Sequence, residues 1–410
     1  MASSRTILVA GAGIGGLTAS LALAARGFRV VVLEQASRLE ETGAGIQLSP
    51  NASRVLIRLG LAETLAPVVC VPDVVRVRKA SSGRDIVTLP IGRSERYYGA
   101  PYWTVHRGDL QAALLAKVRE CGDIEIKLGA RVDEFAIHPN GVTVAFSGPT
   151  GASDVGGIAL IGADGLRSQV REKLGDARPP RPAGRAAWRT LLPVQVLAPE
   201  LRTPSVNLWI GRGAHLVHYP VRGGELVNIV AIATDDTEAP GWSSPASSGE
   251  VLQHFPENRW PLGARALIAR PERWLRWTLY DRPPLKKWGR GPVTLLGDAA
   301  HPMLPFLAQG AAMAIEDAIV LADALAKRPE APAAALRAYE RARRPRDHDV
   351  QRAARRNDRF YHLGGPMALA RDLVMRVGLG GELMLARYDW IYDWQPPADV
   401  LAPEPAPEPA

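Results

Sequence analysis

The segment Thr6–Glu34, TILVA-GAGIGG-LTASLALAARGF-RVVVLE, decides the fold of this chain. Its first five residues form an apolar run that is typical of a buried strand, and a glycine-rich turn follows directly. Apolar residues then recur at steps of three and four, which predicts a helix, and Gly27 is placed to end it. Val30–Leu33 predicts a second buried strand. The segment therefore predicts the strand-helix-strand unit that begins a Rossmann-type fold.

The glycines after the first strand predict a close approach to a phosphate group. Gly11, Gly13 and Gly16, with Gly15 beside them, follow the Gly-x-Gly-x-x-Gly pattern between a strand and a helix. A pyrophosphate can approach such a backbone and place its charge at the N-terminus of the helix. Glu34 lies eighteen residues after Gly16 and is expected to accept hydrogen bonds from a ribose. A tight glycine turn without a ligand stays the alternative.

A second motif, LLGDAAHP at residues 295–302, separates FAD from NAD. It ends an apolar run, so Asp298 is expected at a strand end among small residues. There it can hold a ribityl hydroxyl, which FAD has and NAD lacks. A helix is expected from Gly310 to Ala326, with the positive end of its dipole toward the flavin. An aspartate that only stabilises a turn or caps a helix stays the alternative.

A third motif, GADGLRS at residues 162–168, again ends a strand and turns into a helix. Asp164 and Arg167 lie where a nucleotide diphosphate could be contacted. An Asp-Gly turn before a capped helix, without any ligand, explains the motif equally well.

The remaining pattern predicts an α/β chain in which a strand-rich substrate domain interrupts a Rossmann-type FAD-binding domain. Alternation with period two predicts a hairpin within 73–100, strands on either side of a tight turn at 139–141, and further strands within 179–289. The expected parts are an FAD-binding domain at 1–72, 101–178 and 290–355, a substrate domain at 73–100 and 179–289, a C-terminal helical segment at 356–395 and a disordered tail at 396–410.

Composition excludes several classes of protein. No apolar run is long enough to span a bilayer, and the first residues lack the pattern of a secretory signal. We therefore expect a cytoplasmic protein that has no membrane partner. Cys70 and Cys121 are too few for a disulfide framework or a zinc site. The net charge of +8 includes an arginine-rich segment, 337–359, which is expected to be a solvated helix face rather than a nucleic-acid site. The sequence leaves open whether the protein forms a homodimer.

With these three motifs in this order, the chain resembles the class A flavoprotein aromatic hydroxylases of the para-hydroxybenzoate hydroxylase fold. Within them it is most similar to salicylate hydroxylase and 6-hydroxynicotinate 3-monooxygenase. The likeness extends from about Thr6 to Tyr392 and includes GAGI at 43–46, HRGDL at 106–110 and the block 295–317. These motifs are specific for the family and much less so for a substrate.

The resemblance implies an FAD-dependent monooxygenase that hydroxylates a small phenolic acid, such as salicylate or a hydroxybenzoate, with O2 through a flavin C4a-hydroperoxide. NADH or NADPH binds transiently, which fits a sequence without a second dinucleotide motif, and no metal is required. The residues implied to hold FAD, besides the glycine turn, are Glu34, Gln47, Arg107, Val132, Asp164, Asp298, Gly310 and Ala311.

On the substrate side, His215 and Tyr219 lie on one face of a predicted strand, because their spacing matches its period of two. The resemblance places this pair beside the substrate, where His215 would relay a phenolic proton. A histidine that only packs within the sheet stays the alternative. Pro305 and Phe306 are expected in the pocket wall. Phe306 and Gln47 replace histidines of 6-hydroxynicotinate 3-monooxygenase, which leaves the substrate in doubt.

Two other functions remain. An isoprenoid reductase or halogenase shares the FAD fold, although the chain lacks the Trp-x-Trp-x-Ile-Pro motif of halogenases. A non-catalytic nucleotide-binding protein would keep the first glycine motif but would have no need for Asp298. The sequence leaves open the aromatic ring, the position hydroxylated, whether carboxylate is lost, and the choice between NADH and NADPH.

Overall fold

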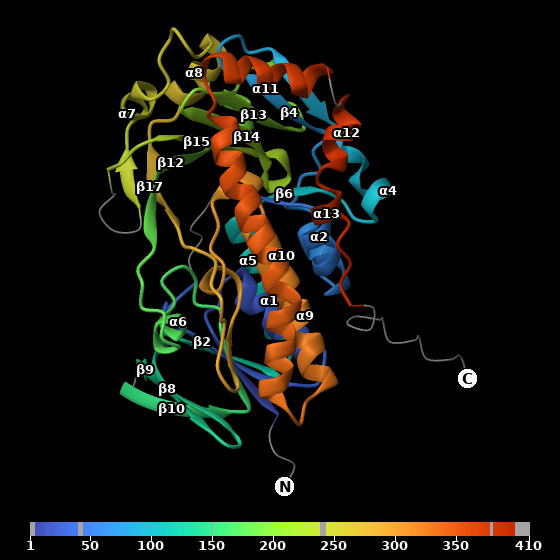
Figure 1. Ribbon diagram of the computed structural model, residues 1–410, viewed down its shortest axis with the longest axis vertical. Coiled ribbons are helices and arrows are strands. Elements are labelled where there is room, and N and C mark those ends of the chain that lie inside the picture. The colour runs from blue at the N-terminus through green and yellow to red at the C-terminus, as the bar shows by residue number, and fades with distance from the viewer. Residues whose placement is uncertain (1–4, 40–43, 150, 238–242, 378–379, 398–410) are drawn as a thin grey trace, which may run out of the picture.

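The computed structural model describes residues 5–39, 44–149, 151–237, 243–377 and 380–397. Two strand-rich halves lie one above the other, and the long helix α10 (Pro332–Tyr361) runs along both of them (Figure 1). The lower half contains a parallel sheet, and the upper half contains a larger mixed sheet. This architecture confirms the predicted α/β fold class.

Five parallel strands form the Rossmann-type sheet, in the order β18-β11-β1-β2-β7. They are β1 (Thr6–Ala10), β2 (Arg29–Glu34), β7 (Ile124–Leu128), β11 (Ala159–Gly162) and β18 (Val293–Leu295). Helix α1 (Ile14–Ala24) joins β1 to β2, as predicted, and packs against α5 (Arg107–Glu120) and α9 (Gly310–Lys327). The largest hydrophobic core lies between these helices and the sheet, which explains the unbroken apolar sequence of β1.

A small antiparallel sheet contacts β1, β2 and β11 at the lower end of the molecule (Figure 1). It consists of β8 (Arg131–His138), β9 (Gly141–Gly148) and β10 (Gly151–Gly157). The predicted turn at 139–141 joins the first two strands. The sequence analysis missed β10, whose glycines and exposed polar residues carry no apolar alternation.

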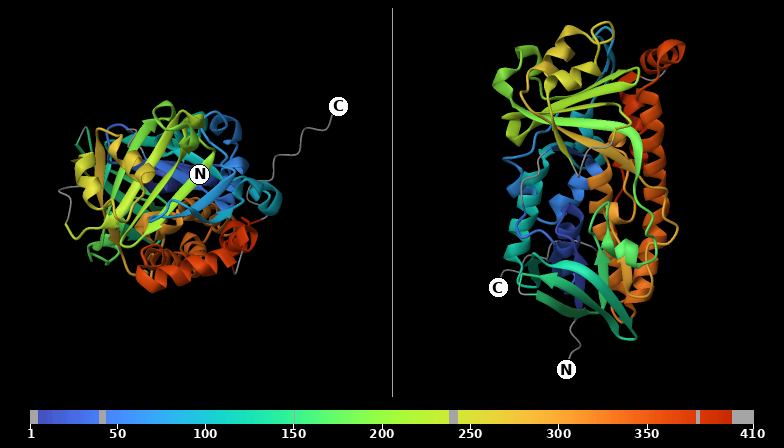
Figure 2. Two further views of the ribbon diagram at one scale, coloured as in Figure 1. Left: turned by 90° about the horizontal axis from the view of Figure 1, so that it is seen from above. Right: turned by 90° about the vertical axis from the view of Figure 1, so that its left-hand side faces the viewer.

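The upper half is built on an eight-stranded sheet, in the order β16-β17-β12-β15-β14-β13-β4-β5 (Figure 2). Its strands are β4 (Val74–Lys79), β5 (Asp85–Leu89), β12 (Arg181–Pro193), β13 (Ser205–Gly211), β14 (Ala214–Val221), β15 (Leu226–Thr234), β16 (Ser244–Ala246) and β17 (Trp274–Asp281). The hairpin of β4 and β5 is present as predicted, and β4 pairs in parallel with β13. Thus residues 73–100 join the sheet formed by 179–289. The strands β12 and β17 lie within the predicted strand-rich range 179–289, although their own positions were not predicted.

A two-stranded ribbon lies between the halves. The ribbon pairs β3 (Gly45–Leu48) with β6 (Trp103–His106), and β6 contacts β14. Gly45 fits here because a Cβ atom would lie 2.7 Å from the Tyr219 ring. The remaining α-helices of the first two thirds are α2 (Pro50–Arg58), α3 (Ala62–Leu65), α4 (Ser94–Tyr98), α6 (Gln169–Lys173), α7 (Ser248–Gln253) and α8 (Leu262–Ala269).

The C-terminal region is helical. After α10 come α11 (Gly365–Val377), α12 (Gly380–Ala386) and α13 (Asp389–Tyr392). Helix α10 runs unbroken through the predicted boundary at 355/356, so that boundary does not coincide with the end of an element. The predicted tail at 396–410 lies outside the described residues except for its first two positions. In the described ranges, no helix combines the length and apolar character needed to cross a bilayer.

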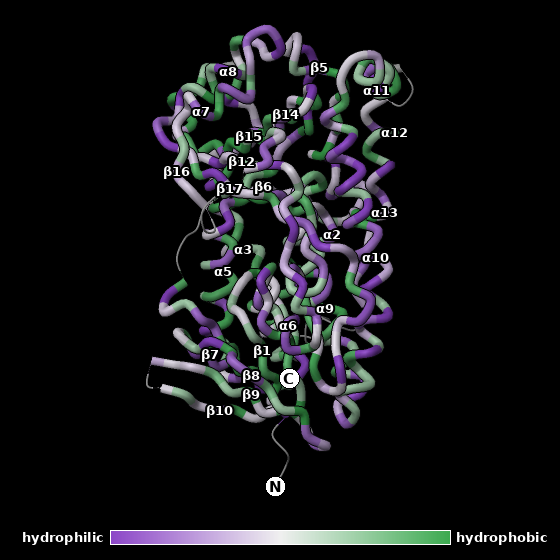
Figure 3. The backbone as a smooth tube through the Cα atoms, turned by 60° about the vertical axis from the view of Figure 1, so that its left-hand side comes forward, coloured by the Kyte–Doolittle hydropathy of each residue, from purple (hydrophilic) through white to green (hydrophobic). Residues whose placement is uncertain are grey.

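The arginine-rich helix α10 is mostly hydrophilic, in contrast with the mostly hydrophobic α9 (Figure 3). The prediction of a solvated face is nevertheless wrong for Arg343, which is 1% exposed. Its guanidinium donates to Glu316 and Asp317 of α9, at 2.5 and 2.6 Å, and to Asp347 at 3.0 Å. Arg343 thereby joins the two helices through buried charge-assisted hydrogen bonds.

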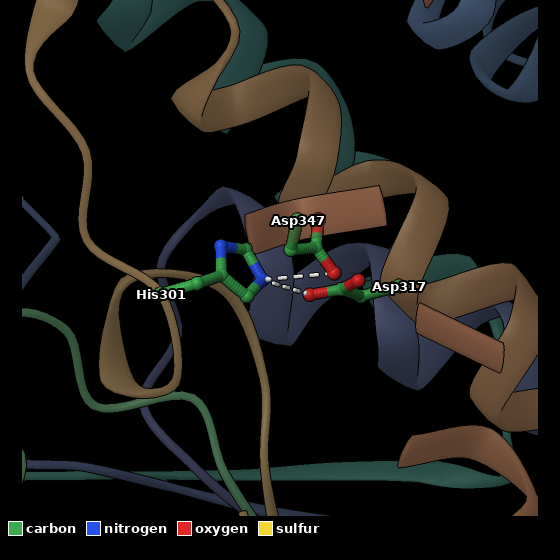
Figure 4. A group of neighbouring side chains, drawn as sticks. All are labelled: His301, Asp317 and Asp347. Atoms are coloured by element: carbon green, nitrogen blue, oxygen red, sulfur yellow. Dashed lines mark hydrogen bonds and ion pairs between the residues drawn. The ribbon is translucent and has the colours of Figure 1, made fainter. Parts of the chain in front are cut away.

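His301 adds a further buried charge to this cluster (Figure 4). Its Nε2 atom lies 2.6 Å from Asp317 and 3.8 Å from Asp347. Burial would lower the pKa of His301, but the two carboxylates raise it to about 9. The stability gained from this shift is complete below the ordinary pKa of 6.5 and is lost as the pH rises through 9.

These three residues could in principle bind a metal ion, because their ligand atoms lie within 4.8 Å of one another. The guanidinium of Arg343 already supplies the positive charge that a metal would bring. We therefore describe the group as an ion-pair cluster that joins α9, α10 and the loop after β18.

Replacing Arg343 with Met should lower the free energy of unfolding by about 3–5 kcal/mol, because three buried carboxyl groups lose their common hydrogen-bond donor. Urea unfolding of the purified protein measures the change. Arg352→Met is the matched control on the same helix, since the Arg352 side chain is 65% exposed and should contribute at most about 1 kcal/mol. Equal stability of the two variants would contradict the assigned role of the cluster.

Candidate functional site

The glycine turn after β1 leaves one face of its backbone open. Gly11 has φ +102°, and a Cβ atom there would lie 2.5 Å from the carbonyl oxygen of Ala163. A Cβ atom on Gly16 would lie 2.0 Å from the carbonyl oxygen of Gly11. At Gly13, by contrast, a Cβ atom would meet nothing within 4 Å. Two glycines are thus required by packing, whereas Gly13 faces open space at the N-terminus of α1.

Glu34 lies at the end of β2 beside this turn. Its two carboxylate oxygens accept hydrogen bonds from the backbone N–H groups of Ala12, at 2.7 Å, and Ala36, at 2.8 Å. Each carboxylate oxygen keeps a second lone pair. The structure therefore places Glu34 beside the turn, while its contact with a ribose stays a prediction.

A cavity of about 380 Å³ extends from the glycine turn to the eight-stranded sheet. We call it the strand-end cavity, because it lies past the ends of β1, β11 and β18. Its polar lining includes Gln47, Arg107, Arg189, His215, Tyr219 and Asp298. Glycine backbone lines one end of this cavity, and the aromatic side chains of His215 and Tyr219 line the other.

Asp298 and the start of α9 lie on one side of the strand-end cavity. Asp298 belongs to a short 3-10 helix, Gly297–Ala299, that follows β18 directly. Asp298 has exposed surface, and it lines the cavity. The protein around its carboxyl group disfavours the charged form and so raises its pKa. Gly310 and Ala311 begin α9 at the cavity wall and present the positive end of the helix dipole.

A second cavity of about 250 Å³ adjoins the first and is mostly apolar. We call it the sheet cavity, because side chains of β4, β5, β13 and β14 form one of its walls. The two cavities share the side chains of Gln47, His215, Val217, Pro305 and Ala308. A molecule bound in one cavity would therefore lie beside a molecule bound in the other.

His215 lies at this junction and Tyr219 lines the strand-end cavity, and both lie on one face of β14 as their spacing predicted. His215 is 2% exposed, and burial, His362 and Arg185 lower its pKa well below the usual value. Burial raises the pKa of Tyr219, so its phenol keeps its proton. At physiological pH the cavity therefore faces a neutral imidazole and a neutral phenol.

Comparison with known proteins assigns the family. Residues 4–354 match the family model described as an FAD binding domain. The chain is 38% identical to 3-hydroxybenzoate 6-hydroxylase 1 of Aquipseudomonas alcaligenes, over 94% of this chain and 96% of that protein. It is 39% identical to 3-amino-4-hydroxybenzoate 2-monooxygenase of Streptomyces cremeus, over 97% and 98% of the two chains.

The chain belongs to the FAD-dependent aromatic hydroxylases. Solved structures agree with this assignment. Klebsiella pneumoniae HpxO complexed with FAD and uric acid has a TM-score of 0.82 at 26% identity, covering 94% of this chain and 96% of HpxO. A salicylate hydroxylase substrate complex has a TM-score of 0.78 at 25% identity, covering 96% and 97%. The predicted recognition, cofactor and enzyme class are therefore confirmed: the hydroxylase is a flavoprotein monooxygenase that uses FAD and NAD(P)H.

The strand-end cavity fits FAD. The open backbone at Gly13 suits a pyrophosphate, and Asp298 offers carboxylate oxygens to ribityl hydroxyls. Arg107 and Arg189 line the same space, and the Nε atom of Arg189 has no hydrogen-bond partner in the described part of the chain. Positive side chains and a helix N-terminus are thus available for an anionic cofactor.

The structure does not bring every predicted cofactor residue to this cavity. Gly13, Gly15, Gln47, Arg107, Asp298, Gly310 and Ala311 line it. Val132 lies instead in the core, paired with Phe146 of β9. Asp164 accepts hydrogen bonds from Ser168 Oγ and Val170 N and so holds the turn before α6. Direct contacts of these two residues with a nucleotide stay predictions.

Sequence reasoning missed the partners of the predicted residues. The Tyr102 hydroxyl donates to Gln47 at 2.7 Å and so fixes this side chain between the cavities. His215 Nδ1 lies 2.8 Å from Nε2 of His362, near the end of α10. The spacing of Asp358 and His362 on a predicted helix could have indicated that pair. It could not have indicated a contact with a strand 147 residues away in the sequence.

Replacing Asp298 with Ala should raise the Kd for FAD by about 10- to 100-fold, because charge-assisted hydrogen bonds worth about 1.5–3 kcal/mol are lost. Titration of the apoprotein with FAD, followed by quenching of flavin fluorescence, gives the Kd. Asp154→Ala, at an exposed position on β10, is the control and should leave it unchanged. Unaltered FAD affinity in Asp298→Ala would show that this residue only stabilises the turn.

Gly13→Ala should lower FAD affinity, whereas Gly16→Ala should lower the stability of the protein. The methyl group at position 13 enters open space, so the apoprotein should unfold within about 1 kcal/mol of the parent while FAD affinity falls. The methyl group at position 16 meets the Gly11 carbonyl, so stability should fall by about 3 kcal/mol or more. Thermal unfolding and FAD titration of both apoproteins test this. Parental FAD affinity in Gly13→Ala would contradict a phosphate site at that face.

Proposed function

We propose that this hydroxylase adds a hydroxyl group to a hydroxybenzoate, with the aromatic ring bound in the sheet cavity. The observation that carries the proposal is the position of His215 in the wall that the sheet cavity shares with the FAD site. A phenol that contacts His215 lies next to the place where oxygen is activated. The named substrates of the relatives, 3-hydroxybenzoate and 3-amino-4-hydroxybenzoate, are both benzoates with a phenolic hydroxyl.

The sheet cavity matches a phenolic acid along its length. Its middle is lined by apolar and aromatic side chains such as Val77, Leu208 and Phe306, which suit a flat ring. Arg356 and Arg387 also line the cavity, and both side chains are exposed to solvent. We propose that the carboxylate of the substrate lies toward these arginines, and the phenolic hydroxyl toward His215.

In this arrangement His215 acts as a general base. Because its pKa is lowered well below the usual value, the resting imidazole is neutral and has a lone pair that can receive the phenolic proton, although the same shift makes it a weaker base. The resulting phenolate ring is electron-rich at the carbons ortho and para to its oxygen. Position 6 of 3-hydroxybenzoate is para to the hydroxyl, which agrees with the position named for that relative.

Tyr219 and Gln47 position the ring rather than move protons. The pKa of Tyr219 is raised by burial, so the phenol donates a hydrogen bond and does not act as a base. Gln47 is fixed by Tyr102 at the boundary of the two cavities. When FAD is bound and reduced by NAD(P)H, it supplies the activation of O2 that protein side chains cannot supply. Pro305 and Phe306 keep water from this boundary.

The cellular setting belongs to the same proposal. The requirement for NAD(P)H supports the cytoplasm, where this reductant is available. Formation of a homodimer stays a prediction.

The test is a screen of 3-hydroxybenzoate, salicylate and 3-amino-4-hydroxybenzoate for NADH and NADPH oxidation matched by hydroxylated product. His215→Ala should lower the rate of product formation by about 100- to 10,000-fold, as is typical for loss of a general base, while FAD stays bound. NAD(P)H oxidation should continue in part and yield H2O2, because a ring that keeps its phenolic proton is a poor nucleophile. The ratio of product to NAD(P)H consumed measures this uncoupling.

His218→Ala is the matched control, because His218 lies on the same strand but on its opposite face, stacked on Trp209. It should keep the parental ratio. A His215→Ala enzyme with parental rate and ratio would leave His215 as a structural residue of the sheet. If the parent hydroxylates none of these acids, the assigned substrate class is wrong.

A further inference from the structure

We infer that His362 and Asp358 act as a proton relay that orients His215 and connects it to the protein surface. The inference rests on the proposed function, in which His215 takes the phenolic proton. It adds two positioning residues, Asp358 of α10 and His362 directly after it, from outside the predicted substrate domain, and it specifies which nitrogen of His215 faces the substrate.

The three side chains form a continuous line of hydrogen bonds. His215 Nδ1 lies 2.8 Å from His362 Nε2, and His362 Nδ1 lies 2.9 Å from Asp358 Oδ1. Arg185 of β12 donates from its Nε atom to the same carboxylate oxygen at 3.0 Å. Arg185 also donates to the carbonyl oxygen of Gly213, just before β14. The line therefore joins the end of α10 to the sheet beneath it.

The carboxylate fixes the position of every proton in this line. Asp358 is ionised, because hydrogen bonding from His362 and the charge of Arg185 lower its pKa, although burial acts in the opposite direction. An ionised carboxylate only accepts, so His362 must carry its proton on Nδ1. A neutral His362 then accepts at Nε2, and His215 must donate to it from Nδ1.

His215 is consequently left with a bare lone pair on Nε2. His215 lines both cavities, and its Nδ1 edge is turned to His362, so Nε2 is the nitrogen available to a substrate. The opposite tautomer would present an N–H group and could not accept a proton. Thus Asp358 selects, through His362, the basic form of His215, whereas the aspartate of a catalytic triad selects the tautomer of its histidine by a direct hydrogen bond.

The line also leads outward. The side chains of His215 and His362 are buried, whereas the side chain of Asp358 is 20% exposed. When a phenol gives its proton to His215 Nε2, the proton on Nδ1 can pass to His362 Nε2. His362 is then positively charged and shares a hydrogen bond with the negatively charged Asp358, from which the proton reaches solvent. Each step breaks one N–H or O–H bond and forms another, so no oxidant or other reactant is needed.

The neighbouring groups support a neutral resting state. The titratable and charged side chains that face His362 are His215 of β14, Asp358 of its own helix and Arg185 of β12. Tyr361 and Phe306 contribute neutral rings beside His215. Burial lowers the pKa of His362, and Asp358 opposes that shift. His362 is thus neutral at rest, and Asp358 allows it to carry a proton briefly during turnover.

The test replaces Asp358 with Asn, which keeps the shape but no longer selects one tautomer of His362. On holoenzyme with one FAD per chain, ultraviolet difference spectra of bound 3-hydroxybenzoate report the pH at which the phenol ionises. We expect this pH to rise in Asp358→Asn, kcat for hydroxylation to fall by about 10- to 1,000-fold, and KM to change by less than about 3-fold. Asp358→Glu should recover part of the kcat.

Combining variants distinguishes a relay from a general loss of packing. His215→Ala with Asp358→Asn should be no slower than His215→Ala alone, because the relay acts only through His215. His362→Gln is a second variant, with the same expected shift in phenol ionisation, should Asp358→Asn fold poorly. Asp349→Asn, at a 51% exposed position of the same helix, is the control and should match the parent.

The outcomes separate this inference from the proposed function. If the parent hydroxylates a hydroxybenzoate but Asp358→Asn and His362→Gln keep its phenol ionisation and kcat, the relay is wrong and the proposed function stands. Additive losses in the double variant would also overturn the relay. If the parent neither binds nor hydroxylates these acids, the proposed function fails, and the inference fails with it.

Discussion

The buried guanidinium of Arg343 is the constraint on which the arrangement of the site depends. It binds Glu316 and Asp317 of α9 and Asp347 of α10, and the same Glu316 accepts a hydrogen bond from Asn51 of α2. Helix α9 begins at the strand-end cavity, and α10 ends beside His215. Because one buried charge joins these helices, the cofactor end and the substrate end of the molecule keep a fixed separation. The hydrogen bonds from this one guanidinium to three carboxyl groups hold the two helices in one arrangement.

The walls of the two cavities differ in chemical character, and each wall suits a different ligand. The strand-end cavity is formed by glycine backbone, a helix N-terminus and charged side chains, which suit a phosphate-bearing cofactor. The sheet cavity is mostly aliphatic and aromatic, with its cations at exposed positions. The wall that the two cavities share consists of Gln47, His215, Val217, Pro305 and Ala308, and burial lowers the pKa of His215, so its imidazole is neutral at rest.

Local sequence motifs predicted several elements of the fold and the positions of several candidate site residues. The strand, glycine turn and helix of β1 and α1 are encoded within one continuous segment, and Asp298 directly follows a buried strand, so both were placed correctly. The shared face of His215 and Tyr219 follows from strand alternation alone. In contrast, the positions of β12 and β17 within the predicted strand-rich range were not foreseen, because arginines and tryptophans interrupt their alternation. The contact of His215 with His362 could not be foreseen, since it depends on how α10 lies against the sheet.

The central claim is that a phenolic acid lies in the sheet cavity with its hydroxyl at His215 and with FAD in the adjoining strand-end cavity. A crystal structure of the FAD-bound enzyme with 3-hydroxybenzoate tests this most directly. The account predicts a phenolic oxygen within hydrogen-bond distance of His215 Nε2, the carboxylate toward Arg356 and Arg387, and an unbroken line from His215 through His362 to Asp358. A ring bound with its hydroxyl away from His215, or a flavin that fills the sheet cavity, would contradict it.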